Sequence, residues 1–265
     1  MKTFDPREKR LVLITDPACF SLSALSDLFL EQALSRAQLR VVDRLAEGDV
    51  RSFILSESSL FVTPTCLTAV TCGPADPSSL LADFLRTIPQ ESVQGVQIES
   101  RFTSSAHTLP VVQNALRRTS DSIPGTLHFH SAYSSFVDPP RSTRILMRGP
   151  ILERRLKDTA AAVFRFFCSL TGPCRLHEYY FSPAGYSSNV FSPLILGCTH
   201  ITPGNDGYLS IEYCSKSDSH IQVDWDCVLR QFQDLTVRLI AEYRGKIIES
   251  RFIHPSGLMP AATNP

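Results

Sequence analysis

A glutamate and two serines interrupt an apolar run, and their side chains could do chemistry there. The run reads Phe53-Ile54-Leu55-Ser56-Glu57-Ser58-Ser59-Leu60-Phe61-Val62. Polar residues in such a place most often form a turn. A serine hydroxyl can also attack the preceding peptide carbonyl, which converts the amide into an ester. Elimination then leaves dehydroalanine, which hydrolyses to a pyruvoyl group, and Glu57-Ser58 offers the acyl group and the hydroxyl for this reaction.

A pyruvoyl group would supply chemistry that ordinary side chains lack. Its ketone can form a Schiff base with a substrate amine and delocalise the carbanion that remains when an amino acid loses carbon dioxide. The Glu57-Ser58 bond is therefore a candidate origin for an electron sink.

Three more short motifs follow this run in order. They are Cys72-Gly73, Gly185-Tyr186-Ser187-Ser188-Asn189 and His200-Ile201-Thr202-Pro203. Together with the segment 55–61, they resemble the motifs of the pyruvoyl-dependent S-adenosylmethionine decarboxylases of the eukaryotic type. The resemblance runs from about Phe4 to the 240s, and the departures described below are those of a divergent member.

The resemblance implies that the chain cuts itself between Glu57 and Ser58. The products would be residues 1–57 (the beta chain) and residues 58–265 (the alpha chain). The longer product would begin with a pyruvoyl group made from Ser58, which would be the cofactor.

The resemblance also assigns roles to the residues of the other motifs. The acyl shift needs a group that stabilises the tetrahedral oxyanion and a base that removes the serine α-proton. These tasks fall to Ser187 and His200, and imidazole suits the second because its unperturbed pKa is about 6.5. Cys72 would protonate the carbanion, since a thiol with an unperturbed pKa of about 8.5 still carries its proton at neutral pH. Without their neighbours, these residues would be ordinary buried residues.

Residues that match the substrate-binding positions of the family lie near the N-terminus and in the second half of the chain. Phe4 and Phe181 match the two aromatic residues that sandwich adenine, and a π face suits a planar base and a nearby sulfonium. Asp5 and Glu8 fall where the family has acidic residues. Glu57 is also a candidate substrate-binding residue.

One expected binding residue is missing. The family has a carboxylate directly after the His-x-Thr-Pro motif, where it holds the ribose hydroxyls, but this chain has Gly204. Unpaired buried hydroxyls would weaken binding by roughly 1–3 kcal/mol each. Asp206 could replace the carboxylate if the loop is rearranged. Glu212 matches an acidic residue that helps some relatives bind an activating putrescine, although an acid on an alternating strand is more often at the surface.

Composition excludes several classes of partner. The chain has 265 residues, with 26 basic and 26 acidic side chains and no basic run. It therefore lacks the electrostatic footprint of a protein that binds nucleic acid or an anionic membrane. Residues 1–10 lack the apolar core of a signal peptide, and no apolar stretch approaches the roughly 20 residues of a membrane helix. We expect a cytoplasmic protein whose scattered cysteines are reduced.

Hydrophobic periodicity predicts both strands and helices. We expect strands near 11–14, 66–71, 96–98, 127–129 and 208–213, and helices near 21–37, 77–88, 151–170 and 226–243. The clustering of the strands favours an α+β fold with antiparallel sheets. The resemblance implies a four-layer α/β/β/α sandwich of two antiparallel sheets flanked by helices, formed by one decarboxylase-like domain over residues 1–265.

Other clusters are weaker candidates for a site. His128 and His130 would place two imidazoles on one strand face, as in a metal pair, but no third ligand is evident. Cys198-Thr199-His200 could also mimic a metal clip. We therefore predict no metal site.

Three functions remain open. The first is decarboxylation of S-adenosylmethionine, which supplies the aminopropyl donor for spermidine and spermine. The second is a pyruvoyl-dependent relative that acts on a different amino-acid-like substrate, and Gly204 motivates it. The third is a non-catalytic paralogue that regulates an active relative in a mixed dimer, and the presence of the processing residues argues against it. The candidate partners are a second copy of the chain, in a homodimer, and putrescine as an activator.

Overall fold

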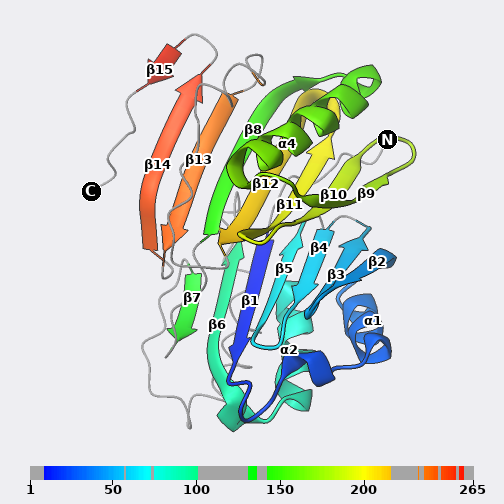
Figure 1. The fold of residues 1–265 in the computed structure, drawn as a ribbon, viewed down its shortest axis with the longest axis vertical. Coiled ribbons are helices and arrows are strands. Elements are labelled where there is room, and N and C mark those ends of the chain that lie inside the picture. Colours follow the sequence, from blue (N-terminus) through cyan, green and yellow to red (C-terminus); the bar gives the residue numbers. More distant parts are fainter. Residues whose placement is uncertain are drawn as a thin grey trace. The chain divides into compact units, whose positions relative to one another are not determined.

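The computed structural model describes residues 9–56, 58–72, 75–100, 131–135, 142–215, 232, 236–243, 246–254 and 257–259. Contacts group the chain into two compact units, Met1–Pro139 and Pro140–Pro265. We call them the N-terminal unit and the C-terminal unit, and each is described by itself (Figure 1). Each unit contains one antiparallel sheet.

The N-terminal unit is built on a seven-stranded sheet with the order β2-β3-β4-β5-β1-β6-β7. The first strand of the chain pairs with β5 on one side and with β6 on the other. The strands are β1 (Lys9–Thr15), β2 (Val41–Glu47), β3 (Val50–Leu55), β4 (Ser58–Val62), β5 (Cys66–Thr71), β6 (Val93–Ser100) and β7 (Ser131–Ser135).

Two helices, α1 (Asp27–Arg36) and α2 (Pro77–Thr87), pack on one face of this sheet (Figure 1). Ser26 caps α1, and the Asp76 carboxylate caps α2 by accepting the N–H of Ser78. Short 3-10 turns lie at Leu22–Ala24 (η1) and Gln90–Ser92 (η2). The predicted helix at 77–88 is confirmed, whereas the helix predicted from residue 21 begins only at Asp27.

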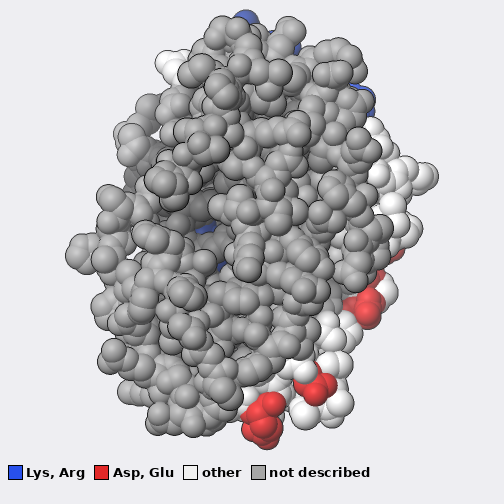
Figure 2. Space-filling model, turned by 90° about the vertical axis from the view of Figure 1, so that its left-hand side faces the viewer, with Lys and Arg blue, Asp and Glu red and all other residues white. Residues whose placement is uncertain are grey.

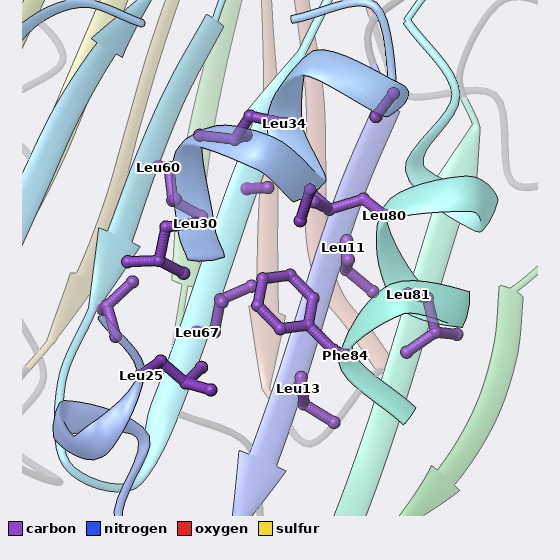
Figure 3. Packing of buried hydrophobic residues seen from close by; sticks show 14 of the residues in the cluster. Leu11, Leu13, Leu25, Leu30, Leu34, Leu60, Leu67, Leu80, Leu81 and Phe84 are labelled. Atoms are coloured by element: carbon purple, nitrogen blue, oxygen red, sulfur yellow. The ribbon is translucent and has the colours of Figure 1, made fainter. Parts of the chain in front are cut away.

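The core of the N-terminal unit lies between these helices and the sheet. Leu30 and Leu34 of α1 and Phe84 of α2 face alternate residues of the strands, and Leu11 and Leu13 of β1 are among them (Figure 3). All five side chains are fully buried. Because strand side chains alternate between faces, this packing fixes the register of the strands that carry the candidate site.

The C-terminal unit is built on an eight-stranded sheet with the order β15-β14-β13-β8-β12-β11-β10-β9. Its strands are β8 (Ser142–Ile151), β9 (Arg175–Tyr180), β10 (Tyr186–Phe191), β11 (Ile195–Thr202), β12 (Gly204–Ser215), β13 (Thr236–Tyr243), β14 (Lys246–His254) and β15 (Gly257–Met259).

One face of the C-terminal sheet packs against α4 (Leu156–Thr171), which follows a 3-10 turn, η4 (Glu153–Arg155). Phe166 and Phe167 of this helix are buried against the strands. A Cβ atom at Gly197 of β11 would lie 2.7 Å from a ring carbon of Phe167, so the glycine lets the helix approach the sheet closely. The predicted helix near 151–170 is thus confirmed.

The predicted fold class is confirmed. The chain has an α+β fold with two antiparallel sheets, with α1 and α2 packed on one and α4 packed on the other. The predicted strands near 11–14, 66–71, 96–98 and 208–213 are present. Residues 127–129 lie outside the described part of the chain.

The helix predicted near 226–243 is wrong over its last turns. Residues Thr236–Tyr243 form β13, which pairs with β8 on one side and β14 on the other. Val237, Leu239 and Ala241 alternate with Arg238 and other residues, so the segment also has the period of a strand. Pairing on both sides decides between the two patterns.

The few described residues that are visible in Figure 2 include acidic side chains along the lower right edge and basic side chains near the top of the view. Among the described residues, no helix is long and apolar enough to cross a bilayer. No disulfide joins the described cysteines, and the Sγ atoms of Cys168 and Cys174 lie 3.3 Å apart.

Candidate active site

Ser58 is the first residue of β4, where it lies opposite Leu55 of β3 and Thr71 of β5. It lies on the same face of β4 as Leu60 and Val62, which belong to the core beneath the helices. The Ser58 side chain is fully buried, and its Oγ makes no hydrogen bond among the described residues. A buried hydroxyl without a partner costs about 1–3 kcal/mol.

Cys72 directly follows Thr71 at the end of β5 and is 1% exposed. The thiol is therefore held close in sequence and in space to the strand that pairs with Ser58. Glu57 lies outside the described residues, as does the next residue after Cys72, Gly73. The predicted role of Cys72 as a proton donor stays a prediction.

Ser187 and His200 lie directly opposite each other on β10 and β11. Both side chains point to the face of the sheet opposite α4, because their neighbours Tyr186 and Ile201 belong to the core under that helix. The Ser187 Oγ atom lies 2.8 Å from Nδ1 of His200 in a buried hydrogen bond. The fold thus brings together two residues that the sequence placed in separate motifs.

Burial sets the charge of His200. Desolvation lowers the pKa of its imidazole to about 4, and the Glu212 carboxylate opposes this change by raising the pKa. The ring is therefore neutral at pH 7. In the tautomer with hydrogen on Nδ1, the imidazole donates to the Ser187 Oγ atom, so the serine proton and the Nε2 lone pair are both available. Nε2 is buried with no hydrogen-bond partner among the described residues.

Glu212 lies on the same face of the sheet, one strand away from His200. It is opposite Cys198 on β11 and Arg144 on β8. The Nε atom of Arg144 lies 3.0 Å from a carboxylate oxygen of Glu212, and their side chains are 1% and 5% exposed. Glu212 is therefore a buried partner of an arginine, contrary to the alternative of a surface acid. The sequence reasoning missed Arg144.

Phe181 follows β9 and is partly buried. Its N–H donates to the carbonyl of Gly185, which closes a tight loop before the Gly-Tyr-Ser motif. The Phe181 ring contacts Tyr179 edge to face, with ring centroids 4.9 Å apart. Tyr179 is opposite Ser187, so an aromatic pair borders the serine, although the sequence reasoning had singled out only Phe181. Phe4, Asp5 and Glu8 lie outside the described residues.

The segment after the His-Ile-Thr-Pro motif is shaped by glycines. Gly204 has a φ of +158°, and the pairing of β12 with β8 shifts register between Gly204 and Gly207. A Cβ atom at Gly207 would lie 2.8 Å from the Cβ of Ile151. The side chain of Asp206 is not among those described, so its predicted replacement of the missing carboxylate stays a prediction. His128 and His130 also lie outside the described residues.

Comparisons with known proteins relate the chain to one family. Residues 2–122 match the family described as adenosylmethionine decarboxylase. The chain is 25% identical over 248 residues to the S-adenosylmethionine decarboxylase proenzyme of Spinacia oleracea, and the match covers 77% of this chain and 68% of that protein. Proenzyme 2 of Dianthus caryophyllus is 26% identical, with coverages of 77% and 65%. The proenzyme of Pisum sativum is 27% identical, with coverages of 77% and 69%. The chain spans about two thirds of the length of these relatives.

Proposed function

We propose that this chain, a divergent member of the adenosylmethionine decarboxylase family, is a self-processing enzyme that decarboxylates S-adenosylmethionine. The observation that carries the proposal is the buried hydrogen bond of 2.8 Å between Ser187 and a neutral His200. A hydroxyl donor and an unprotonated imidazole are the two groups that the acyl shift and elimination require.

The environment of Ser58 fits its conversion into a pyruvoyl group. Its Oγ is buried without a hydrogen-bond partner among the described residues, so the hydroxyl is not held in a competing hydrogen bond. Conversion removes this hydroxyl and leaves no partner unsatisfied. When present, the carbonyl of the pyruvoyl group supplies the electron sink that loss of a carboxylate from an amino acid needs.

The proposed self-cleavage uses the side chains of this chain alone. Ser58 Oγ attacks the carbonyl carbon of Glu57, and the resulting ester replaces the peptide bond. Ser187 donates a hydrogen bond to the oxyanion of the tetrahedral intermediate. His200 accepts the α-proton of Ser58, and the ester breaks to release Glu57 as a carboxylate. Hydrolysis of the remaining dehydroalanine consumes water and releases ammonia.

In the decarboxylation that follows, Cys72 is the proposed proton donor to the product carbon. Its burial keeps water away from the thiol, so protonation there would be specific. Phe181 is the proposed stacking partner for adenine, together with Phe4. The product would be the aminopropyl donor for spermidine and spermine.

A second substrate class is favoured by one observation. Gly204 stands where the family holds the ribose hydroxyls with a carboxylate, and its positive φ is a conformation that glycine adopts more easily than glutamate. The alternative is a pyruvoyl-dependent enzyme that acts on another amino-acid-like amine. Release of carbon dioxide from S-adenosylmethionine, compared with a panel of amino acids, separates the two.

The homodimer and the putrescine activator are also proposals, and each has its own test. A homodimer would appear as twice the chain mass in solution scattering. A putrescine activator would have to compete for Glu212 with Arg144, whose guanidinium already neutralises this carboxylate. We therefore expect added putrescine to leave the turnover rate unchanged, and a rise in rate would show that the diamine binds elsewhere or displaces the arginine.

Intact mass spectrometry of the freshly purified chain tests the proposal most directly. We expect fragments of residues 1–57 and 58–265, with a hydrazine-reactive carbonyl at the start of the longer one. Ser58→Ala should stay as one chain and lose activity. Ser59→Ala is the matched control and should still be cut. An uncut wild-type chain without a reactive carbonyl would refute the mechanism, while a cut chain inert toward S-adenosylmethionine would refute only the substrate.

A further inference from the structure

A row of buried polar side chains crosses the C-terminal sheet beside the Ser187–His200 pair. The members lie opposite one another on successive strands, and each is less than a tenth exposed. From β9 to β8 they are His177, Asn189, Cys198, Glu212 and Arg144. The adjacent row on the same face contains Tyr179, Ser187, His200 and Ser210.

The ion pair in this row is not explained by stability alone. Removing two charges from water costs several kcal/mol per ion, and well-packed apolar residues often replace a buried ion pair without loss of stability. The opposite face of the same strands shows that apolar residues suit this sheet, since Ile145 of β8 and Ile211 of β12 pack there under α4. The charges at Arg144 and Glu212 therefore point to a role toward a neighbouring group.

His200 is the neighbour that the geometry selects. Glu212 is opposite Cys198, which is two residues before His200 and on the same face of β11. Diagonal neighbours of this kind are about 7–8 Å apart between Cα atoms, which is close enough for a charge to act in a dry environment. The Glu212 carboxylate favours protonation of His200. The Arg144 guanidinium lies 3.0 Å from that carboxylate, so its positive charge offsets the negative charge that His200 experiences.

We propose that Arg144 and Glu212 are positioning residues that act as a pair on His200. Arg144 neutralises Glu212, which keeps the imidazole in its neutral, proton-accepting form with Nδ1 hydrogen-bonded to Ser187. The inference rests on the proposed function for its catalytic meaning, but the charge effect exists whether or not the chain is cut. The other titratable or charged side chains on this face of β9 to β12 are Arg175, His177, Tyr179, Cys198, Tyr208 and Cys214. Arg175 lies opposite Phe191, four residues along β10 from Ser187.

The test is a titration of the His200 imidazole by NMR in the uncleavable Ser58→Ala chain. The spectrum of a Ser58→Ala/His200→Gln chain assigns the signal. In Ser58→Ala alone, we expect no titration of His200 between about pH 5 and pH 8, where an ordinary histidine titrates. Adding Arg144→Met leaves the carboxylate uncompensated, so the midpoint should rise into this range.

Two further variants test the loss of the carboxylate charge and the loss of both charges. Glu212→Gln leaves the guanidinium alone, so His200 should again show no titration in this range. The double variant Arg144→Met/Glu212→Gln removes both charges, and its titration should return to that of the Ser58→Ala parent. Arg51→Met is the matched control, because Arg51 pairs with Asp27 at 3.0 Å in the N-terminal unit. It should leave His200 unchanged.

Stability of the variants is checked by far-UV circular dichroism. Losing one member of a buried ion pair leaves an uncompensated buried charge, which can unfold the chain. Arg144→Gln is the second variant for that case, because its amide can still donate to Glu212 while the charge is gone. The same rise of the His200 midpoint is expected. An unchanged midpoint in a folded Arg144→Met or Arg144→Gln chain would overturn the inference.

Self-cleavage gives an independent readout in chains that keep Ser58. If Arg144→Met raises the His200 midpoint above the assay pH, each unit of pH below the midpoint lowers the neutral fraction about tenfold. The cleavage rate of this variant should therefore fall steeply with acid, whereas the wild-type rate should not. A chain that is never cut would refute the proposed function while the titration still reported on the pair.

Discussion

Ser58 and Thr71 lie directly opposite each other on β4 and β5, and both hydroxyls are fully buried without a hydrogen-bond partner among the described residues. Two such groups side by side are costly, because each loses its hydrogen bonds to water on folding. A sheet selected for stability alone would place apolar side chains here, as it does at Leu60 and Ala69, the next pair on this face.

Replacing Thr71 with valine should therefore stabilise the uncut chain. Thr71→Val in the Ser58→Ala background removes an unsatisfied hydroxyl and keeps the branched shape. We expect the free energy of unfolding in urea to rise by about 1 kcal/mol. Thr68→Val is the control, because the Thr68 hydroxyl contacts the Cys66 thiol at 3.7 Å. Equal destabilisation by both substitutions would mean that the Thr71 hydroxyl makes a hydrogen bond in solution.

Loss of the Ser187 hydroxyl should slow self-cleavage. Ser187→Ala removes the proposed oxyanion donor, and the loss of one such donor typically reduces a rate by roughly 10²-fold or more. Ser188→Ala is the matched control, since Ser188 is equally buried but points to the opposite face of β10. Gel analysis of freshly translated chains measures both rates. Similar rates for the two variants would remove Ser187 from the mechanism.

Acid should destabilise the folded chain through His200. Its pKa is about 4 when folded and about 6.5 when unfolded, so the unfolded state binds the proton first as the pH falls. This contribution is fully present above pH 6.5 and is lost between about pH 6.5 and pH 4, by roughly 3 kcal/mol in total at 1.36 kcal/mol per pKa unit.

Urea unfolding of Ser58→Ala and Ser58→Ala/His200→Gln across this pH range isolates the effect of His200. Glutamine cannot titrate, so the difference in unfolding free energy between the two chains should change with pH as stated. A difference that is constant between pH 4 and pH 7 would contradict the neutral state of the buried imidazole.

Cys72→Ala should separate processing from decarboxylation. The proposed proton donor acts only after the substrate has lost its carboxylate, so the two fragments should form at the normal rate. Turnover should fall by roughly 10²- to 10⁴-fold, the usual effect of general acid catalysis. Cys66→Ala, at the first residue of β5, is the control for loss of a thiol from the same strand. Full turnover of Cys72→Ala would assign the proton to another group.

Gly204→Glu tests the substrate. If S-adenosylmethionine is bound, the new carboxylate should strengthen binding by about 1–3 kcal/mol, or about 5- to 150-fold in KM. The backbone φ of +158° opposes the change, although a Cβ atom there meets only the Gly207 nitrogen at 3.9 Å. Gly204→Ala measures this backbone cost alone. No gain over the alanine variant would favour a different substrate.

The local parts of the site could be predicted from the sequence. Asp76-Pro77 marked the start of α2, and the order of the short motifs singled out Ser187 and His200 as candidates. Their hydrogen bond could not be predicted, because it depends on the pairing of β10 with β11 in one register. A shift of one residue would place the two side chains on opposite faces of the sheet.

Arg144 escaped prediction for a related reason. An arginine in an alternating strand indicates a solvated face, and nothing near it in the sequence signals that Glu212 will lie opposite across β8 and β12. The same ambiguity misled the prediction at Thr236–Tyr243, where apolar residues fit both a helical and a strand period. Only the pairing of distant strands resolves such cases.

The strand order of the N-terminal sheet bears on what backbone scission would do. The peptide bond before Ser58 lies between β3 and β4, so the shorter product would contain β1, β2 and β3. Yet β1 sits between β5 and β6 of the longer product, and β3 pairs with β4. The nicked halves would remain interleaved through three strand borders and could separate only by unfolding. Covalent connectivity would change while the architecture persisted.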